Sequence, residues 1–222
     1  MCVHCLKLSS SGRRTSKSPW RTLVVAVLSL QSMCAAAGGG PLGIDRELAL
    51  DTGGIWARRY QTGIENGAIV VEIAGALWFG NDDELGHTFW QDIDSTALSG
   101  VAAQLLKYAV GRPRPYQRDD PDAFFKGIHY QSFPSGEVTL QAAFVTPLIL
   151  NYYKADPWVW ALEALPVYDA IARLKSQAHW QTDVIAGGLL GTGFGYWATT
   201  RATPISVQIL PRGLSVGFRT RF

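Results

Sequence analysis

The stretch GRPRP at residues 111–115 limits most strongly how this chain can fold. Each proline lacks a backbone N–H and disfavours the helical conformation in the residue before it, so no helix continues through this stretch. Residues 84–110 before it contain no proline, and they follow a turn-like Gly-Asn-Asp-Asp sequence that places acids at a helix start. The sequence therefore predicts one long helix that ends at about Val110.

The segments on either side of this helix predict an all-α fold, a bundle of about six helices. Segment 66–79, NGAIVVEIAGALWF, fits either a strand or a helix, because its β-branched run favours a strand while its closely spaced Ala and Gly suit helix packing. Residues 115–133 form a long polar loop, a length that is usually functional or disordered. The other helices are expected at 52–62, at 135–153 with a kink at Pro147, at 156–174 with Asp156 as the cap, and from near His179 or Thr182 to 200.

The last residues, 204–222, predict an accessory β-hairpin. In ISVQIL the apolar residues alternate with polar ones, PRG follows as a turn, and apolar positions then recur on one face. A terminal Phe222 is also typical of the last strand of an outer-membrane barrel, but one hairpin cannot close a barrel. We expect the hairpin to pack on the bundle or on a second subunit of a homodimer.

The first residues, 1–37, predict a secretory signal peptide. They combine a basic lead, the apolar run LVVAVLSL and small residues at Ala35 and Ala37. The alternative is an N-terminal anchor that is not cleaved. We therefore expect a helical domain over 38–203 in an exported protein that is periplasmic or associated with the outer membrane.

The charge and the cysteines belong largely to this leader. Without its five basic residues the net charge of +2 becomes −3, which gives no reason to expect a nucleic-acid partner. All three cysteines lie in the leader, and the four histidines show no ligand spacing, so we expect neither a metal nor a cofactor. Charged residues or proline interrupt every long apolar run, which favours a soluble or membrane-associated domain over a multi-span protein.

Two clusters and a helix start supply groups that bind anions. Each has an ordinary structural explanation alone, as a helix C-terminus or a cap. Together, three cations can neutralise a phosphoryl dianion, while a hydroxyl and a backbone N–H donate at a helix N-terminus. The residues are Lys107, Arg114, Ser135, Gly136 and Arg173.

His179 and Asp183 add a nucleophile to this predicted phosphate site. They are four residues apart, so on a helix they share one face, which by itself is a common structural pair. Beside three cations, the imidazole can attack phosphorus, and Asp183 can hold the proton on the far ring nitrogen and fix the tautomer.

The three groups in this order resemble the signature motifs of the type 2 phosphatidic acid phosphatase and vanadium haloperoxidase superfamily. The resemblance covers Lys107-x6-Arg114-Pro115, Pro134-Ser135-Gly136 and Arg173-x5-His179-x3-Asp183. It implies a helical bundle and metal-independent hydrolysis of a phosphate ester. It also implies that His179 forms a phosphohistidine, that Asp183 orients it, and that the three cations, Ser135 and Gly136 bind the phosphoryl oxygens.

Two positions depart from the family pattern. Ala172 stands where the family usually has Ser, and Glu137 stands where it has the His that protonates the leaving group. We expect Glu137 to act as the general acid. The function predicted is an exported phosphatase for a phosphomonoester or a lipid phosphate, with contact to a membrane surface. The alternatives are an impaired member that binds phosphate or phospholipid without turnover, and a vanadate-dependent haloperoxidase.

Overall fold

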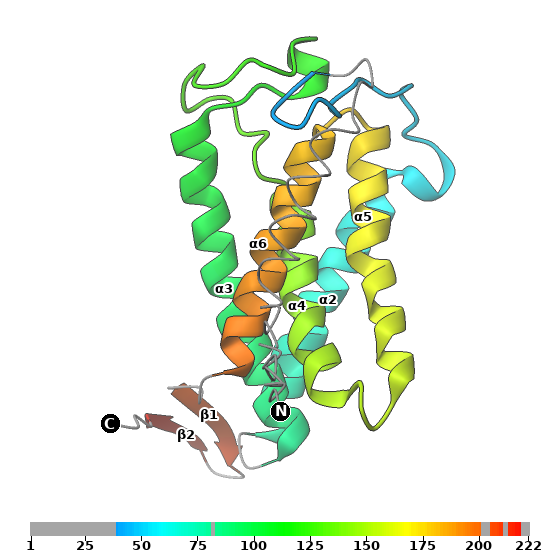
Figure 1. Cartoon of the computed structure of the whole chain (residues 1–222). Coiled ribbons are helices and arrows are strands. Elements are labelled where there is room, and N and C mark those ends of the chain that lie inside the picture. Colours follow the sequence, from blue (N-terminus) through cyan, green and yellow to red (C-terminus); the bar gives the residue numbers. More distant parts are fainter. Residues whose placement is uncertain (1–38, 81–82, 201–204, 211–212, 219–222) are drawn as a thin grey trace, which may run out of the picture. The chain divides into compact units, whose positions relative to one another are not determined.

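The structure is a computed structural model that describes residues 39–80, 83–200, 205–210 and 213–218. This part is mostly helical, which confirms the helical character of the predicted fold (Figure 1). The predicted leader lies outside the described residues, as does the turn at 211–212. The described helices are η1 (Gly54–Trp56), α2 (Arg58–Phe79), α3 (Glu84–Val110), η2 (Pro115–Gln117), α4 (Gly136–Tyr152), η3 (Pro157–Glu163), α5 (Ala164–Lys175) and α6 (Gln181–Thr199), followed by the antiparallel strands β1 (Ile205–Leu210) and β2 (Gly213–Phe218), in which Val207 lies opposite Val216.

Helix α3 begins and ends where the sequence predicts. Asp83 caps its start, because the side-chain Oδ1 accepts from the backbone N–H of Leu85 at 2.9 Å. Gly111 ends it in the left-handed conformation, with φ of 52°, and donates its N–H to the Lys107 carbonyl at 3.0 Å. A side chain at 111 would also meet the backbone of Gly127 at 2.8 Å, so the turn requires glycine twice over.

The helix count differs from the prediction of about six, since the described part contains five α-helices. The strand alternative for 66–79 is wrong: this segment belongs to α2, which starts at Arg58 and includes only the last five residues of the short helix expected at 52–62. Packing against α3 explains the helix, because Gly75 lies directly on the ring of Phe89, where a Cβ would come within 2.4 Å. The helix expected at 156–174 begins as the 3₁₀ segment η3, and Pro166 falls in the first turn of α5, where its missing N–H leaves no hydrogen bond unmade.

Helix α6 packs closely on α4 through glycines on one face. A Cβ at Gly187 would lie 2.5 Å from the Ser135 carbonyl oxygen, and one at Gly191 would lie 2.2 Å from the Thr139 carbonyl oxygen. Any larger residue at either position would push the helices apart. This contact therefore fixes the start of α6 against the start of α4.

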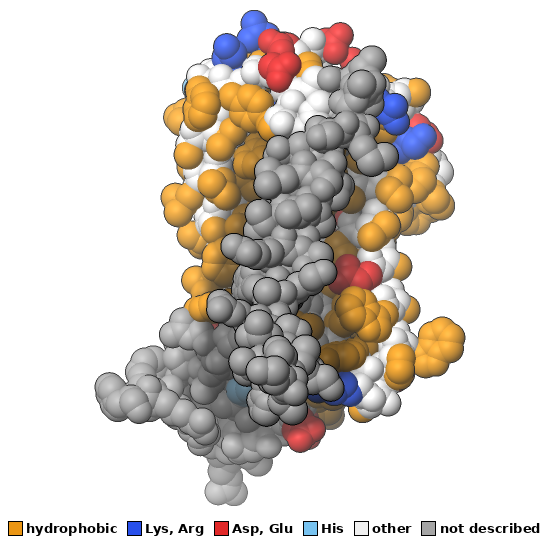
Figure 2. All heavy atoms as spheres, in the orientation of Figure 1, with side chains coloured by type: hydrophobic (Ala, Val, Ile, Leu, Met, Phe, Trp, Pro, Cys, Tyr) orange, Lys and Arg blue, Asp and Glu red, His pale blue; other side chains and the backbone are white. Residues whose placement is uncertain are grey.

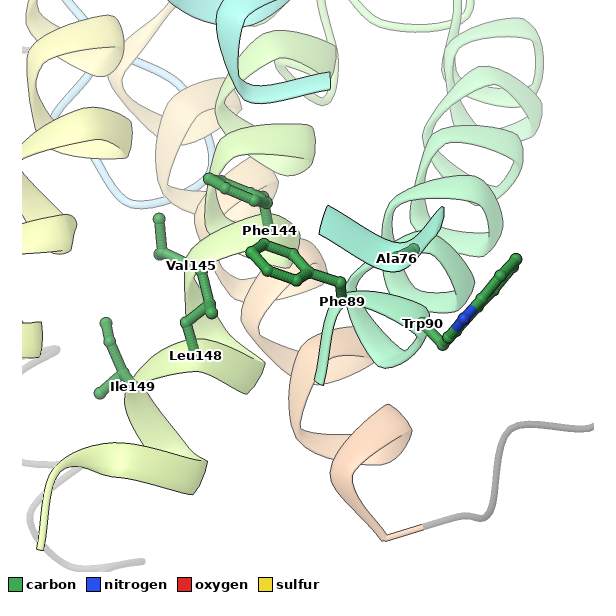
Figure 3. Close-up of a cluster of buried hydrophobic side chains, with 7 residues drawn as sticks. All are labelled: Ala76, Phe89, Trp90, Phe144, Val145, Leu148 and Ile149. Atoms are coloured by element: carbon green, nitrogen blue, oxygen red, sulfur yellow. The ribbon is translucent and has the colours of Figure 1, made fainter. Parts of the chain in front are cut away.

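The apolar core lies between α2, α3 and α4, in their halves remote from Ser135. Figure 3 shows Phe89 of α3 pointing toward the side chains of α4, among them Phe144. Since α4 is apolar on most sides, it is the central helix of the bundle. The cluster consists of Ala76, Phe89, Trp90, Phe144, Val145, Leu148 and Ile149.

Large apolar side chains are also exposed on the flanks of the helices (Figure 2). Trp78 on α2, Leu105 on α3 and Leu189 on α6 are each more than half exposed. Within the described residues, no helix combines the length and the apolar character needed to cross a membrane.

Glu72 is a buried carboxyl in the wall of the bundle, and it makes stability depend on pH. Its Oε1 accepts from the Thr96 hydroxyl at 2.6 Å, but burial raises its pKa from 4.5 to about 7. Between these values the folded state binds more protons than the unfolded state, so the free energy of unfolding falls as pH rises. From about pH 5.5 to 7, the loss from this one residue is roughly 2 kcal/mol.

Glu72→Gln should remove this dependence, because an amide does not titrate. We expect the free energy of unfolding of the variant, relative to wild type, to rise by about 2 kcal/mol between about pH 5.5 and 8, measured by urea denaturation. The exposed Glu47→Gln serves as the control. A constant difference between Glu72→Gln and wild type across this range would contradict the raised pKa.

Candidate active site

Four helix ends meet at one end of the bundle, at the top of Figure 1. They are the C-termini of α3 and α5 and the N-termini of α4 and α6. The backbone N–H of Ser135, before α4, donates to the Asp183 carbonyl in the first turn of α6 at 3.0 Å. Lys107 and Arg173 come from the last turns of α3 and α5. Residues from all three predicted clusters are therefore brought together.

His179 is held as a neutral imidazole with a defined tautomer. It is 3% exposed, and its Nδ1 lies 2.7 Å from the Ser132 carbonyl oxygen. A carbonyl only accepts, so Nδ1 carries the proton and Nε2 keeps its lone pair. Burial lowers the pKa of His179 to about 4, with Lys107 and Arg173 lowering it further and Asp183 opposing. The Nε2 atom is therefore an available nucleophile.

Asp183 orients this histidine less directly than the sequence predicts. Its Oδ2 lies 3.8 Å from His179 Nδ1, beyond hydrogen-bond distance. The same oxygen accepts from the Ser132 hydroxyl and, at 2.9 Å, from the Trp180 backbone N–H. The Nδ1–H of His179, which the sequence predicts to donate to Asp183, instead donates to the Ser132 carbonyl. Asp183 in turn holds Ser132 in place through the hydroxyl of that serine.

A buried ion-pair network supports Asp183 from behind. Arg112 is fully buried and donates at 2.6 Å both to Asp183 Oδ1 and to Asp45 Oδ2. Asp45 also accepts from the backbone N–H of Thr182 at 2.7 Å. The guanidinium lies over the ring of Phe124, 4.5 Å from its centroid. With two carboxylates on one cation, the network keeps the start of α6 in register with the loop that carries Arg112.

Asp183→Asn should damage folding more than chemistry. It removes one of the two charges that compensate buried Arg112, and we expect the free energy of unfolding to fall by about 3 kcal/mol. Turnover should fall much less than in a variant without His179, because the Ser132 carbonyl still fixes the tautomer. Urea denaturation and kcat on the folded fraction measure the two effects. A loss of kcat as large as that of His179→Ala, with stability unchanged, would show that Asp183 acts on His179 directly.

Two cations, Lys107 and Arg173, lie near the histidine, and a third, Arg114, lies near both of them. Lys107 donates its Nζ to the Pro134 carbonyl at 2.6 Å, and burial together with nearby Arg114 lowers its pKa to about 8. Arg173 is buried and donates Nη1 to Gln61 Oε1 at 3.1 Å. Burial, Arg58 and Arg114 lower its pKa, and Glu137 opposes. Arg114 is half-buried and lies within electrostatic reach of both other cations, and its guanidinium has no anionic partner in the described part. Such a concentration of positive charge is stable only beside an anion.

Two polar groups here lack a hydrogen-bond partner among the described residues. The Ser135 hydroxyl is fully buried at the N-terminus of α4, and the Nε of Arg173, at the end of α5, is buried as well. Leaving a buried polar group unpaired costs about 1–3 kcal/mol. A helix N-terminus with an unpaired donor beside cations has the chemistry of a phosphate cradle. Gly136, next along, places no side chain in it, although a Cβ there would come no closer than 3.5 Å to Lys107.

Glu137, in the first turn of α4, lies between two arginines. Its Oε2 forms an ion pair with Arg58 from α2, and its Oε1 lies 3.7 Å from Arg173 Nη1. Burial raises the pKa of this carboxyl, but the hydrogen bond from Arg58 and the charge of Arg173 outweigh burial and hold the pKa below its usual value. Glu137 is therefore a carboxylate in the free site, a state opposite to the one a general acid needs.

Sequence reasoning missed several residues that build the site. Ser132 and Arg112 lie inside stretches that drew attention, but nothing in the sequence separates them from their neighbours. Arg58 and Gln61 form one wall, yet they occupy an unremarkable first turn of a helix. Among the described residues, no group of three or more His, Cys, Asp or Glu side chains is placed to hold a metal ion.

Comparison with known proteins identifies the family. The PAP2 superfamily profile matches residues 93–204, half of the chain and all of the predicted site residues. The chain belongs to the PAP2 superfamily. This confirms the resemblance read from the three motifs, and the matched residues run from within α3 to beyond the end of α6.

Several curated PAP2 relatives are phosphatases by name. The lipid A 1-phosphatase of Porphyromonas gingivalis is 28% identical over 152 residues, 64% of this chain and 32% of that protein. That of Rhizobium etli is 34% identical over 108 residues, 46% of this chain and 44% of that protein. The undecaprenyl-diphosphatase of Sulfolobus acidocaldarius is 30% identical over 122 residues, 54% and 53% of the two chains. The chain thus spans a third to a half of the relatives' lengths. The crystal structure of Aquifex aeolicus LpxE aligns with a TM-score of 0.49 at 18% identity, covering 64% of this chain and 85% of that one.

Proposed function

We propose that this PAP2 protein hydrolyses a phosphomonoester or lipid phosphate through a phosphohistidine. The observation that carries the proposal is the hydrogen bond from His179 Nδ1 to the Ser132 carbonyl, which leaves Nε2 as a free nucleophile near Lys107 and Arg173. Nε2 attacks phosphorus, the bond from phosphorus to the ester oxygen breaks, and the leaving oxygen takes a proton. Water then attacks the phosphohistidine and releases phosphate and the free imidazole.

Charge stabilisation is the role we propose for the surrounding residues. The phosphoryl oxygens gain negative charge in the transition state, and donors fixed around them lower its energy. Lys107, Arg114 and Arg173 supply positive charge. The Ser135 hydroxyl, otherwise unpaired, and the Gly136 N–H donate from the N-terminus of α4.

The names of the relatives and the surface support a lipid substrate. Lipid A 1-phosphatase and undecaprenyl-diphosphatase are named for lipids that carry phosphate. The exposed apolar flanks of α2, α3 and α6 suit contact with a membrane surface. We propose that the protein is exported and that its substrate is presented from such a surface. Sequencing the N-terminus of the mature protein tests whether the leader is cleaved.

One observation favours a second candidate, a protein that binds phosphate or phospholipid without turnover. Glu137 is ionised and paired with Arg58, so the free site lacks an evident proton donor for the leaving group. Phosphate release from p-nitrophenyl phosphate, whose leaving group needs little protonation, separates the two. Release above the buffer rate supports the hydrolase. Calorimetric binding of inorganic phosphate without release of phosphate from any ester would favour the second candidate.

A further inference from the structure

Matching faces of α2 and α4 continue from the phosphate site into the bundle. On α2, Arg58, Gln61, Glu65 and Glu72 recur at intervals of three, four and seven residues, so they lie along one face. On α4, Glu137 is followed on the same face by Leu140, Gln141 and Phe144. The ion pair between Arg58 and Glu137 joins the two faces at the site.

An apolar pocket of about 270 Å³ lies where these faces continue, between α2, α3 and α4. Glu65 marks its end nearest the site, since that carboxyl is within electrostatic reach of Arg58, Glu137 and Arg173. Ile69 and Ile73 are 41% and 48% exposed and form an open rim. The lining includes Glu65, Ile69, Ile73, Ala97, Leu140 and Phe144.

We propose that this pocket binds the unbranched hydrocarbon chain of the substrate while its phosphoryl group lies at His179. The inference rests on the proposed function. Leu140 and Phe144 lie three and seven residues beyond Glu137, about 5 and 10 Å along the axis of α4. The volume accommodates roughly nine groups of the size of a water molecule, at ~30 Å³ each.

The two carboxyls of the pocket do not call for a polar ligand, although the buried Oε1 of Gln141 lacks a hydrogen-bond partner among the described residues. Glu72 already accepts a hydrogen bond from Thr96, and burial raises its pKa to about 7, so below that pH it is mostly uncharged. Glu65 lies toward the cations, where a phosphate headgroup would also lie. Between these two carboxyls the lining is mostly aliphatic, which selects a chain of methylenes rather than a sugar or a peptide.

The test compares butylphosphonate with octylphosphonate, non-hydrolysable ligands, below their critical micelle concentrations. Each methylene buried strengthens binding about fourfold, so the four extra carbons should lower Kd on the order of 10²-fold, measured by calorimetry on the full chain. Ala97→Phe fills the pocket from an exposed position on α3 and should remove most of this gain without affecting butylphosphonate. Ala74→Phe, an exposed alanine of α2 outside the pocket, is the matched control and should keep the gain.

The outcomes separate the pocket from the proposed function. Turnover of butyl and octyl phosphate with equal KM, and equal Kd of the two phosphonates, would overturn the pocket while leaving the hydrolase intact. A chain-length gain that Ala97→Phe removes, without hydrolysis of either ester, would support the pocket and refute the hydrolase. If Ala97→Phe instead dissociated a dimer in sedimentation and left the gain unchanged, the pocket would be an interface with a second copy, and the proposal would be wrong.

Discussion

His179→Ala is expected to lower kcat for phosphate release by at least ~10³-fold, because the variant has no atom to form the phosphoenzyme. Binding of inorganic phosphate should persist within a few-fold of wild type, since the three cations and the start of α4 are unchanged. The alanine also leaves no buried charge behind, because the imidazole it replaces is neutral, with a pKa of about 4. Steady-state kinetics and calorimetry on the same preparation measure both effects.

His87→Ala is the matched control, a histidine near the start of α3 and 20 residues from Lys107, about 30 Å along that helix. It should keep wild-type turnover. Rapid quenching of the wild-type reaction should also trap an acid-labile phosphoenzyme that His179→Ala lacks. If His179→Ala kept more than a few per cent of wild-type kcat while folded, the nucleophile would be a different residue.

The helices of this protein were largely predictable because local signals mark their ends. GRPRP, the Asp83 cap and the left-handed Gly111 determine α3 almost without reference to the rest of the fold. The sequence did not decide between a strand and a helix for the segment 66–79, because both bury such an apolar run equally well. Contact with Phe89 on α3 decides it, and that contact is tertiary.

The predicted site residues are those whose chemistry is visible in short motifs. The structure brings all of them to one end of the bundle, but their roles stay predictions. The remaining partners come from segments 50 to 140 residues away in sequence. Asp45 reaches Arg112 and Thr182, and Arg58 reaches Glu137, through no local pattern at all. Even for Asp183, spacing alone suggested contact with the imidazole, whereas the Ser132 carbonyl, placed by the loop before α4, is the closer partner.

The charge of Glu137 decides what leaving group the site can expel. A departing alkoxide must be protonated, and a general acid contributes roughly 10²–10⁴-fold. In the free site Arg58 and Arg173 keep Glu137 ionised. When a phosphoryl dianion binds, its negative charge is added beside Glu137. Arg173 then also interacts with the new anion, so it stabilises the charge of Glu137 less. Both changes raise the pKa of Glu137 toward a value at which it can donate.

Glu137→Gln should therefore slow hydrolysis of an alkyl phosphate by about 10²-fold or more and of p-nitrophenyl phosphate only slightly, because p-nitrophenolate leaves without a proton. The amide keeps the size of the side chain and can still accept a hydrogen bond from Arg58. For the wild type, alkyl phosphate turnover should fall as pH rises through the pKa of Glu137 in the substrate complex, and the variant should lack this limb. Arg58→Gln, with exposed Arg59→Gln as its control, should move the limb to higher pH, because Glu137 loses the partner that stabilises its charge. Equal losses on the two substrates would show that Glu137 donates no proton. A faster Glu137→Gln would show that its charge only repels phosphate, as expected of a protein that binds without turnover.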